Sequence, residues 1–330
     1  TGLETVLLTA NKIALGQIDS AIAGGVDTTS DAPIGVNEGL RRILLQANRA
    51  KTTAEKIKTF LQLRPQHLVP ELPRNGEPRT GLSMGQHCEL MAQTWQIPRE
   101  EQDQLALESH QKMAASYAEG WHNDLLTPFL GLTRDNNLRP DLTLEKLASL
   151  KPAFDRSAAG TLTAGNSTPL TDGASLVLLG SEQWAQERGL PILAYLRDGE
   201  AGAVDFVKGA EGLLMAPVYA VPRLLARNGL SLQDFDYYEI HEAFAAQVLC
   251  TLKAWEDADY CRDRLGLDAP LGSIDRSKMN VKGSSLAAGH PFAATGGRIV
   301  ANLAKLLSVA QEGRGLISIC AAGGQGVTAI

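Results

Sequence analysis

The sequence predicts a layered α/β fold. From residue 172 onward, apolar segments of strand length alternate with segments in which apolar residues recur at helical spacing. Apolar residues make up 44% of the 330 residues and charged residues 21%, so the chain can bury a large core. Residues 31–160 show mainly helical periodicity and predict a helical lid or insertion.

The elements follow in order along the chain. In residues 1–17, apolar side chains recur at helical spacing, and a buried strand with a glycine turn is expected in 20–28. Because no strand precedes this helix, we expect the start of the domain to be missing from the sequence. Residues 216–229 predict a helix that Pro217 opens and Gly229 closes. The other expected helices are 84–96, 98–120, 143–151, 181–189, 241–255 and 292–309, and the other strands are 172–180, 191–201, 235–240, 277–289 and 315–330.

The charge distribution excludes some function classes. The net charge of −6 argues against a general nucleic-acid binder. Residues 41–64 nevertheless hold seven basic residues and one acidic residue, and this +6 segment could meet an anionic surface or be the solvated face of an ordinary helical insertion. No apolar run approaches the ~18 residues of a membrane span, and residues 1–20 do not resemble a signal peptide, so we expect an intracellular protein.

Three short motifs carry candidate chemistry. In GHPFAATGGR (289–298), His290 sits in a glycine-bounded turn before a helix, where an imidazole can act on a bound carbonyl or simply be hydrogen-bonded at a helix start. In LISICAAGGQG (316–326), Cys320 ends an apolar strand before a small-residue turn, which suits proton transfer or attack, although a core cysteine is the plainer alternative. In HEAFAAQ (241–247), His241 follows a strand at a crossover typical of ligand sites. The remaining histidines and cysteines lack the spacing of a metal site, so no metal is expected.

Together these three motifs, in this order, resemble the C-terminal signature blocks of the thiolases. Supporting similarity lies in 23–33, 98–103, 150–154 and 160–174, so the resemblance covers nearly the whole chain. It implies two βαβαβαββ halves, the first incomplete here, with a helical loop insertion. The implied division is 1–30 for the remainder of the N-terminal half, 31–157 for the loop domain, 158–185 for the closing strand of that half, and 186–330 for the C-terminal half.

The branch of the family is indicated by His241 and Ala322, where most thiolases have Asn and a third glycine. At both positions the chain resembles the β subunits of fatty-acid oxidation trifunctional complexes. The resemblance therefore implies an acyltransferase that cleaves 3-ketoacyl-CoA with CoA to acetyl-CoA and a shortened acyl-CoA in β-oxidation. The alternatives are a biosynthetic acetyl-CoA acetyltransferase and a non-catalytic thiolase-like lipid-binding protein. A decarboxylating ketoacyl synthase fits less well, because Cys320 stands in the final motif.

One departure concerns the nucleophile. Thiolases attack with a cysteine that would lie two residues before Thr1, and the sequence does not contain it. We therefore expect the sequence to be a fragment of a longer thiolase, inactive without its N-terminal segment.

The resemblance also implies roles for individual residues. His290 would lower the pKa of that cysteine and donate to one oxyanion, His241 would hold a water or donate beside it, Cys320 would exchange the proton of acetyl-CoA, and the backbone N–H near Ala322 would form a second oxyanion hole. CoA would be a substrate with no permanently bound cofactor. The implied CoA-contacting residues are Met84, Arg139, Thr168, Ala243 and Phe244, with Arg139 available for the adenosine phosphates.

The expected partners are acyl-CoA and CoA, a second copy of the chain in a homodimer or tetramer, and an α subunit of a β-oxidation complex. Residues 41–64 could make a peripheral membrane contact. The expected location is the bacterial cytoplasm, with mitochondria as the alternative.

Overall fold

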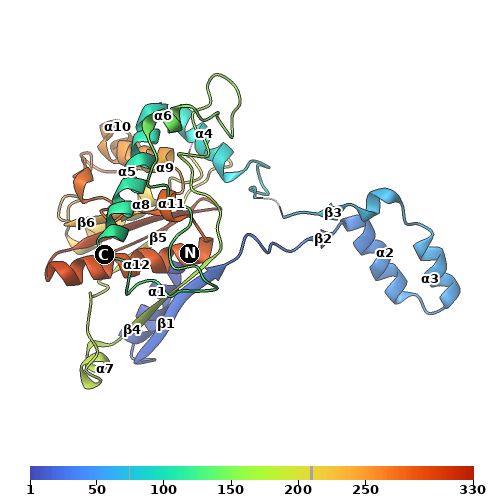
Figure 1. The fold of residues 1–330 in the computed structure, drawn as a ribbon, viewed down its shortest axis with the longest axis horizontal. Helices are drawn as coiled ribbons and strands as arrows, with labels where there is room; N and C mark the ends of the chain where they lie inside the picture. Colours follow the sequence, from blue (N-terminus) through green and yellow to red (C-terminus); the bar gives the residue numbers. More distant parts are fainter. Residues whose placement is uncertain (74, 209–210) are drawn as a thin grey trace.

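The computed structural model describes residues 1–73, 75–208 and 211–330. Two sheets enclose a layer of two helices (Figure 1). The larger sheet has the order β5-β8-β7-β6, and the smaller sheet pairs β1 with β4 in antiparallel register. The strands are β1 (Ser20–Asp27), β4 (Gly173–Gly180), β5 (Gly199–Ala203), β6 (Tyr237–Ile240), β7 (Gly315–Ala321) and β8 (Gln325–Ala329).

The helices α1 (Gly2–Ala14) and α12 (Phe292–Ala310) lie between the two sheets. They approach closely because both carry glycine at the crossing: a Cβ at Gly2 or Gly296 would collide with the backbone of the other helix. Helix α8 (Ala216–Asn228) covers the outer face of β5 and β8, and α9 (Ala245–Glu256) continues the outer layer. Most of the large buried side chains of this body are apolar, and Leu3, Ile299 and Trp255 are fully buried.

Helical elements dominate residues 31–157, as the periodicity predicts. They are α2 (Glu38–Arg49), α3 (Thr53–Phe60), the short 3-10 helix η1 (Pro65–Leu68), α4 (Met84–Thr94), α5 (Arg99–Ala118) and α6 (Leu144–Ala148). Helices α2 and α3 form a hairpin that projects away from the body on two extended segments, which pair as β2 (Gly35–Val36) and β3 (Pro70–Glu71) (Figure 1). We call residues 34–72 the arm.

The basic segment 41–64 contains most of α2 and all of α3. Thr52 accepts a hydrogen bond from the backbone N–H of Glu55, and the Glu55 carboxylate accepts from the backbone N–H of Thr52. This capping box starts a new helix at Thr53, whereas the first helix ends at Arg49.

The other predicted helices and strands are mostly confirmed, including α7 (Glu182–Glu187), and Gly229 closes α8 in the left-handed conformation with φ 63°. The strand expected in 277–289 is wrong. Its residues form the 3-10 helix η2 (Arg276–Lys278) and the short helix α11 (Ser285–Ala288). The Asn280 side chain donates to the Ile240 carbonyl and accepts from the Ile240 N–H, both at 2.9 Å. Apart from one bridge between Tyr238 and Met279, these side-chain hydrogen bonds take the place of backbone pairing with β6.

Two strand predictions were wrong in detail. Of residues 191–201, only the end belongs to a strand, because β5 begins at Gly199. Strands β1 and β4 are half-exposed instead of buried: Ile22 is 66% exposed and Leu176 71%. One face of this pair packs on α1 and α12, while no described element covers the other face.

Candidate active site

His241 lies directly after β6, at the edge of the larger sheet. Strand β6 runs parallel to β7, and the His241 backbone N–H donates to the Ser318 carbonyl of β7 at 2.9 Å. Helix α9 begins only at Ala245, four residues later than the sequence pattern suggests. The imidazole therefore lies in the strand-to-helix crossover, where it is fully buried.

The two ring nitrogens of His241 have different surroundings. Nδ1 lies 2.9 Å from the Ser285 hydroxyl, whereas Nε2 is buried and has no hydrogen-bond partner among the described residues. Burial, followed by the neighbouring His290 and Arg298, lowers the pKa of His241 well below its usual value. The ring is thus neutral at physiological pH.

His290 comes from a different part of the chain and meets His241. Gly289, at φ 96°, ends α11 and turns the chain so that the His290 N–H donates to the Pro169 carbonyl at 3.1 Å. The rings of His290 and His241 lie 4.3 Å apart between centroids. The His290 Nδ1 lies 2.6 Å from the Thr295 hydroxyl, on the first turn of α12. Burial, with a smaller contribution from Arg298, lowers the pKa of His290 to about 4.

Cys320 lies near the carboxyl end of β7. Because β6 and β7 are parallel and Ile240 pairs with Ser318, Cys320 lies at the same sheet edge as His241. The thiol is buried, and this desolvation raises its pKa from 9.0 to about 12. Desolvation thus favours the protonated thiol, which is suited to giving a proton to a stronger base.

The glycine-rich turn after Cys320 is held from two sides. Gly323 and Gly324 adopt φ values of 79° and 73°, and the Gly324 carbonyl accepts from the Val204 N–H at 2.8 Å. The buried carboxylate of Glu77 accepts from the Gly323 N–H at 2.6 Å. Sequence reasoning missed Glu77, because nothing in its local pattern connects it to a turn so far along the chain.

Of the five predicted CoA-contacting residues, four belong to connected segments. Thr168 donates its hydroxyl hydrogen to the Ser285 carbonyl at 2.7 Å, and its N–H donates to the Ala243 carbonyl. The Phe244 ring stacks edge-on against Phe154, 5.9 Å between centroids. The same Phe154 ring packs against Gly85, the residue that follows Met84. Their contact with CoA stays a prediction.

Arg139 is the fifth of these residues. Its side chain is exposed, and one guanidinium nitrogen donates to the carbonyls of Asn136 and Leu138. The neighbouring Asn137 donates to the Ala288 carbonyl at 3.3 Å, which places this loop against the turn that carries His290. Among the described residues, the other guanidinium N–H groups have no hydrogen-bond partner, so they are available to a phosphate.

Behind the histidines lies a buried polar network that the motifs did not reveal. The Glu242 carboxylate accepts hydrogen bonds from the Ser109 hydroxyl, the Asn280 amide and the Leu286 N–H. Glu239 accepts from Asn302 at 2.7 Å through one oxygen, while its other oxygen has no partner among the described residues. Burial raises the pKa of both carboxyls, that of Glu239 to about 7. The only sequence signal for this network was the pair of acidic residues, Glu239 and Glu242, that flank Ile240 and His241.

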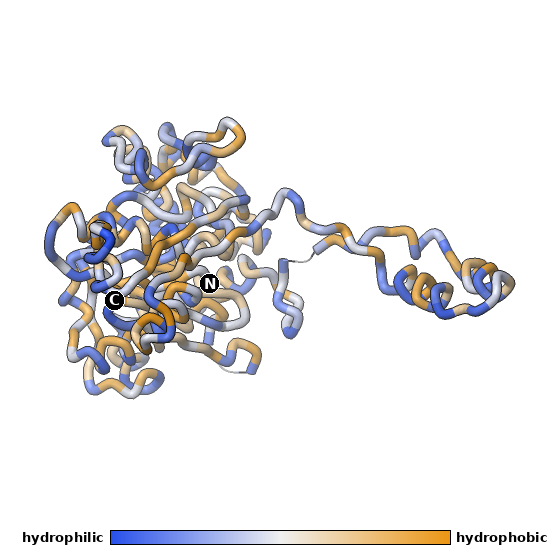
Figure 2. Tube along the Cα trace, turned by 90° about the horizontal axis from the view of Figure 1, so that it is seen from below, coloured by the Kyte–Doolittle hydropathy of each residue, from blue (hydrophilic) through white to orange (hydrophobic). Residues whose placement is uncertain are grey.

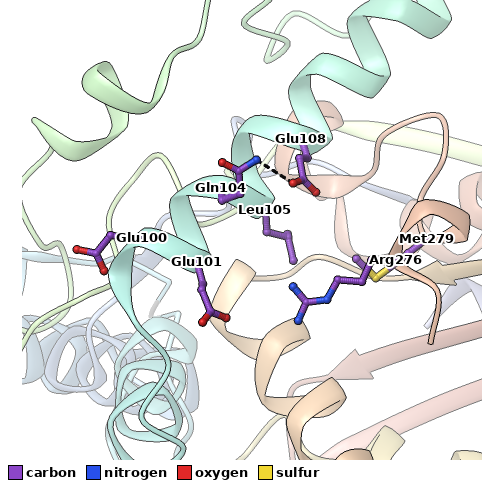
Figure 3. Close-up of a pocket in the computed structure, with 7 residues that line it drawn as sticks. All are labelled: Glu100, Glu101, Gln104, Leu105, Glu108, Arg276 and Met279. Carbon is purple, nitrogen blue, oxygen red and sulfur yellow. Dashed lines mark hydrogen bonds between the residues drawn. The ribbon is translucent and has the colours of Figure 1, made fainter. Parts of the chain in front are cut away.

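A hollow of about 220 Å³ lies elsewhere, beside α5 (Figure 3). Three glutamates, Glu100, Glu101 and Glu108, line it together with Arg276, Gln104, Leu105 and Met279. It contains none of the predicted site residues. Among the described residues, no group of three or more metal-ligating side chains is gathered, and no helix is long and apolar enough to cross a membrane.

Comparison with known proteins agrees with the fold. Residues 1–183 match the thiolase N-terminal domain and residues 190–330 match the thiolase C-terminal domain. The chain belongs to the thiolase family, and so to a family of acyltransferases. This finding confirms the predicted family and its α/β fold.

Individual relatives are similar over the whole chain. The 3-ketoacyl-CoA thiolases of Yersinia pestis and Yersinia pseudotuberculosis are 44% identical to it over 336 residues, covering 100% of this chain and 76% of theirs. The crystal structure of the Bacillus anthracis acetyl-CoA acetyltransferase superimposes with a TM-score of 0.77 at 30% identity, covering 99% of this chain and 75% of that one. The Acat5 thiolase of Ascaris suum in complex with coenzyme A superimposes with a TM-score of 0.76 at 25% identity, with the same coverage.

Proposed function

We propose that the protein is a 3-ketoacyl-CoA thiolase of fatty-acid β-oxidation, which cleaves 3-ketoacyl-CoA with CoA to acetyl-CoA and a shortened acyl-CoA. The observation that carries this proposal is the pair of neutral imidazoles, His241 and His290, in contact at the sheet edge that also holds Cys320. The names of the Yersinia relatives support the choice of substrate.

The pair of imidazoles suits an enolate. Cleavage of the bond between C2 and C3 leaves the electron pair on the acetyl-CoA fragment, and its negative charge is shared with the thioester oxygen. A neutral imidazole can donate a hydrogen bond to that oxygen, and it needs no proton from solvent to do so. Because both rings are buried, the hydrogen bonds act where water does not compete.

Cys320 suits the proton transfer that completes the cleavage. The enolate carbon is a much stronger base than a thiolate, so the Cys320 thiol gives its proton to that carbon and becomes a thiolate, and acetyl-CoA forms. In the reverse direction the thiolate removes a proton from the acetyl-CoA methyl group. The acyl group itself would be carried by the cysteine expected upstream of Thr1.

The substrate would lie along the segments that hold the other predicted residues. The segments that hold Thr168, Ala243 and Phe244 are hydrogen-bonded to one another beside His241. Met84 is next to Gly85, which packs against the Phe154 ring that also contacts Phe244. The exposed guanidinium of Arg139 would meet the adenosine phosphates. The predicted division at residues 30, 157 and 185 is part of this proposal, with the loop domain supplying Met84 and Arg139.

The test uses a protein that also contains the expected upstream cysteine, because a chain without it is expected to be inactive. Incubated with acetyl-CoA in D₂O, the protein should exchange the methyl protons of acetyl-CoA for deuterium, measured by mass spectrometry. No exchange above the buffer rate would overturn the proposal, and fatty-acid binding without exchange would favour the lipid-binding alternative. Competition of the exchange by long-chain 3-ketoacyl-CoA favours the β-oxidation enzyme, whereas competition by acetoacetyl-CoA alone favours the biosynthetic acetyltransferase.

The arm is a further part of the proposed function. It combines cations with exposed apolar residues: Ile57 is 57% exposed and Leu61 79%, and Figure 2 shows polar and apolar positions interleaved along it. This surface fits peripheral contact with an anionic membrane or contact with an α subunit. A homodimer or tetramer and a cytoplasmic or mitochondrial location complete the proposal.

A further inference from the structure

The Ser285 hydroxyl lies between His241 and Arg298. Its oxygen is 2.9 Å from the His241 Nδ1 and 2.9 Å from a terminal nitrogen of the Arg298 guanidinium. Ser285 is fully buried, so water does not supply alternative partners to this hydroxyl.

The chemistry of the three groups decides the direction of each hydrogen bond. A guanidinium can only donate, so the Ser285 oxygen accepts from Arg298. The single hydroxyl hydrogen remains, and His241 Nδ1 is the acceptor within reach among the described residues. If Nδ1 carried a proton instead, the hydroxyl hydrogen would be buried without an acceptor, which is unfavourable.

A neutral histidine that accepts at Nδ1 carries its proton on Nε2. The Nε2 of His241 is buried and has no partner among the described residues, so its N–H is available to a ligand. The opposite tautomer would present a lone pair there and would repel an oxygen that gains negative charge.

We propose that Ser285 and Arg298 are positioning residues that hold His241 in the Nε2–H tautomer, so that His241 donates directly to the thioester oxygen of bound acyl-CoA. The tautomer follows from the hydrogen bonds above. Its use with acyl-CoA rests on the proposed function.

Arg298 contributes through its position as well as its hydrogen bond. It lies on α12, the helix that also holds Thr295 beside His290. Its positive charge opposes protonation of both imidazoles and contributes to the lowered pKa of each. The same guanidinium therefore directs the Ser285 hydroxyl and favours neutral rings.

The experiment measures the tautomer directly by ¹⁵N NMR of the histidine rings. We expect His241 of the unmodified protein to show a protonated Nε2 and an unprotonated Nδ1. Ser285→Ala should introduce the Nδ1–H tautomer, and Ser285→Thr should keep the original one. Arg298→Met should raise the share of the second tautomer less than Ser285→Ala does, because the Ser285 hydroxyl can then turn to accept from Nδ1–H but its hydrogen still lacks another acceptor.

Ser284→Ala is the matched control. Ser284 is equally buried and adjacent, but its hydroxyl lies 3.4 Å from Arg298 and does not contact His241. This variant should leave the tautomer unchanged. In the deuterium-exchange assay, Ser285→Ala should slow exchange on the order of tenfold without weakening CoA binding, while Ser285→Thr and Ser284→Ala should stay near the unmodified rate.

Two results would overturn the proposal. One is a protonated Nδ1 on His241 of the unmodified protein, and the other is an unchanged tautomer in both Ser285→Ala and Arg298→Met when their backbone spectra show native folding. The proposed function fails separately: the expected tautomer in a protein that does not exchange acetyl-CoA protons would leave the hydrogen-bond assignment intact and exclude its use in thiolysis.

Discussion

His241 and His290 lie with their imidazole rings in contact, 4.3 Å between centroids and 49° between ring planes. One follows strand β6 and the other precedes helix α12, and a separate hydroxyl, from Ser285 or Thr295, contacts the Nδ1 of each ring. Two adjacent imidazolium ions would repel, so this arrangement suits a pair of neutral donors. The predictions below test what this pair does together with its surroundings.

Replacing Cys320 should separate proton transfer from binding. Cys320→Ala should slow deuterium exchange into acetyl-CoA by about 100-fold or more, because the proton carrier is removed, while the affinity for CoA measured by calorimetry stays within about twofold. In a protein that also contains the upstream cysteine, covalent acylation by ketoacyl-CoA should persist, whereas His290→Ala should impair both steps. Equal loss of exchange and acylation in a folded Cys320→Ala variant would contradict the assigned role.

The rate of exchange should rise with pH without a histidine inflection. The active form is the Cys320 thiolate, and its pKa of about 12 means that the thiolate fraction grows about tenfold for each pH unit from about pH 6 to 9. His290, with a pKa of about 4, has already lost its proton in this range. The logarithm of the exchange rate against pH should therefore have a slope near one. A plateau near pH 7 would show that another group removes the proton.

The two buried carboxyls should respond oppositely to amide substitution. The raised pKa of Glu239, about 7, means that the unfolded chain loses this proton at lower pH than the folded one, so the carboxyl destabilises the fold increasingly from about pH 4.5 to 7. Glu239→Gln should remove this penalty and gain up to roughly 3 kcal/mol above pH 7. Its amide oxygen can still accept from Asn302.

Glu242→Gln provides the contrast. Both Glu242 oxygens accept hydrogen bonds, from Ser109, Asn280 and the Leu286 N–H, so an NH₂ group must face at least one donor. We expect a loss of about 2–3 kcal/mol in the free energy of unfolding, measured with urea. Equal effects of the two substitutions across pH 5 to 8 would refute the assigned difference.

Glu77 should hold the turn that follows Cys320. Glu77→Ala leaves the Gly323 N–H without its acceptor, so the turn should become more mobile and stability should fall by about 1–2 kcal/mol. Hydrogen exchange at Gly323 should accelerate clearly in this variant and only slightly in Glu77→Gln, which keeps an accepting oxygen. Unchanged protection in Glu77→Ala would mean that the backbone alone fixes the turn.

Charge reversal on the arm should separate its two proposed partners. If the arm docks on an anionic membrane, each cation contributes roughly 1 kcal/mol, so vesicle binding should fall steeply with added salt and be lost when Arg41, Arg42, Lys56 and Lys58 are changed to Glu. Deuterium exchange into acetyl-CoA should not change. Vesicle binding that survives reversal would exclude the membrane use, and loss of binding to a purified α subunit would favour the partner.

The arm cations should not contribute equally. Arg41 and Arg42 both form ion pairs with Glu38, at 2.6 and 2.8 Å, so part of their charge is already balanced. Lys56 and Lys58 form no ion pair among the described residues. Reversing Lys56 and Lys58 alone should therefore remove more vesicle binding than reversing Arg41 and Arg42.

The sequence by itself determined the family and the helices with strong periodicity, and it singled out His241, His290 and Cys320 as candidates. Each of these depends on local pattern: the helix α8 between Pro217 and Gly229 requires only that Pro lacks an N–H and that Gly tolerates positive φ. It also indicated the basic segment, since charge is additive along the chain. It did not reveal the break between α2 and α3, although Thr52 and Glu55 have the spacing of a capping box.

Only the tertiary structure decided how the site residues are hydrogen-bonded and charged. His241 contacts Ser285, and Ser285 contacts Arg298, because α11 and α12 pack beside the end of β6. No local spacing in the sequence encodes these contacts. Burial raises the pKa of the Cys320 thiol because the fold removes it from water, and this favours the protonated form. Protonation states, tautomers and long-range acceptors such as Glu77 depend on desolvation and on contacts between distant segments, and these exist only once the layers have packed.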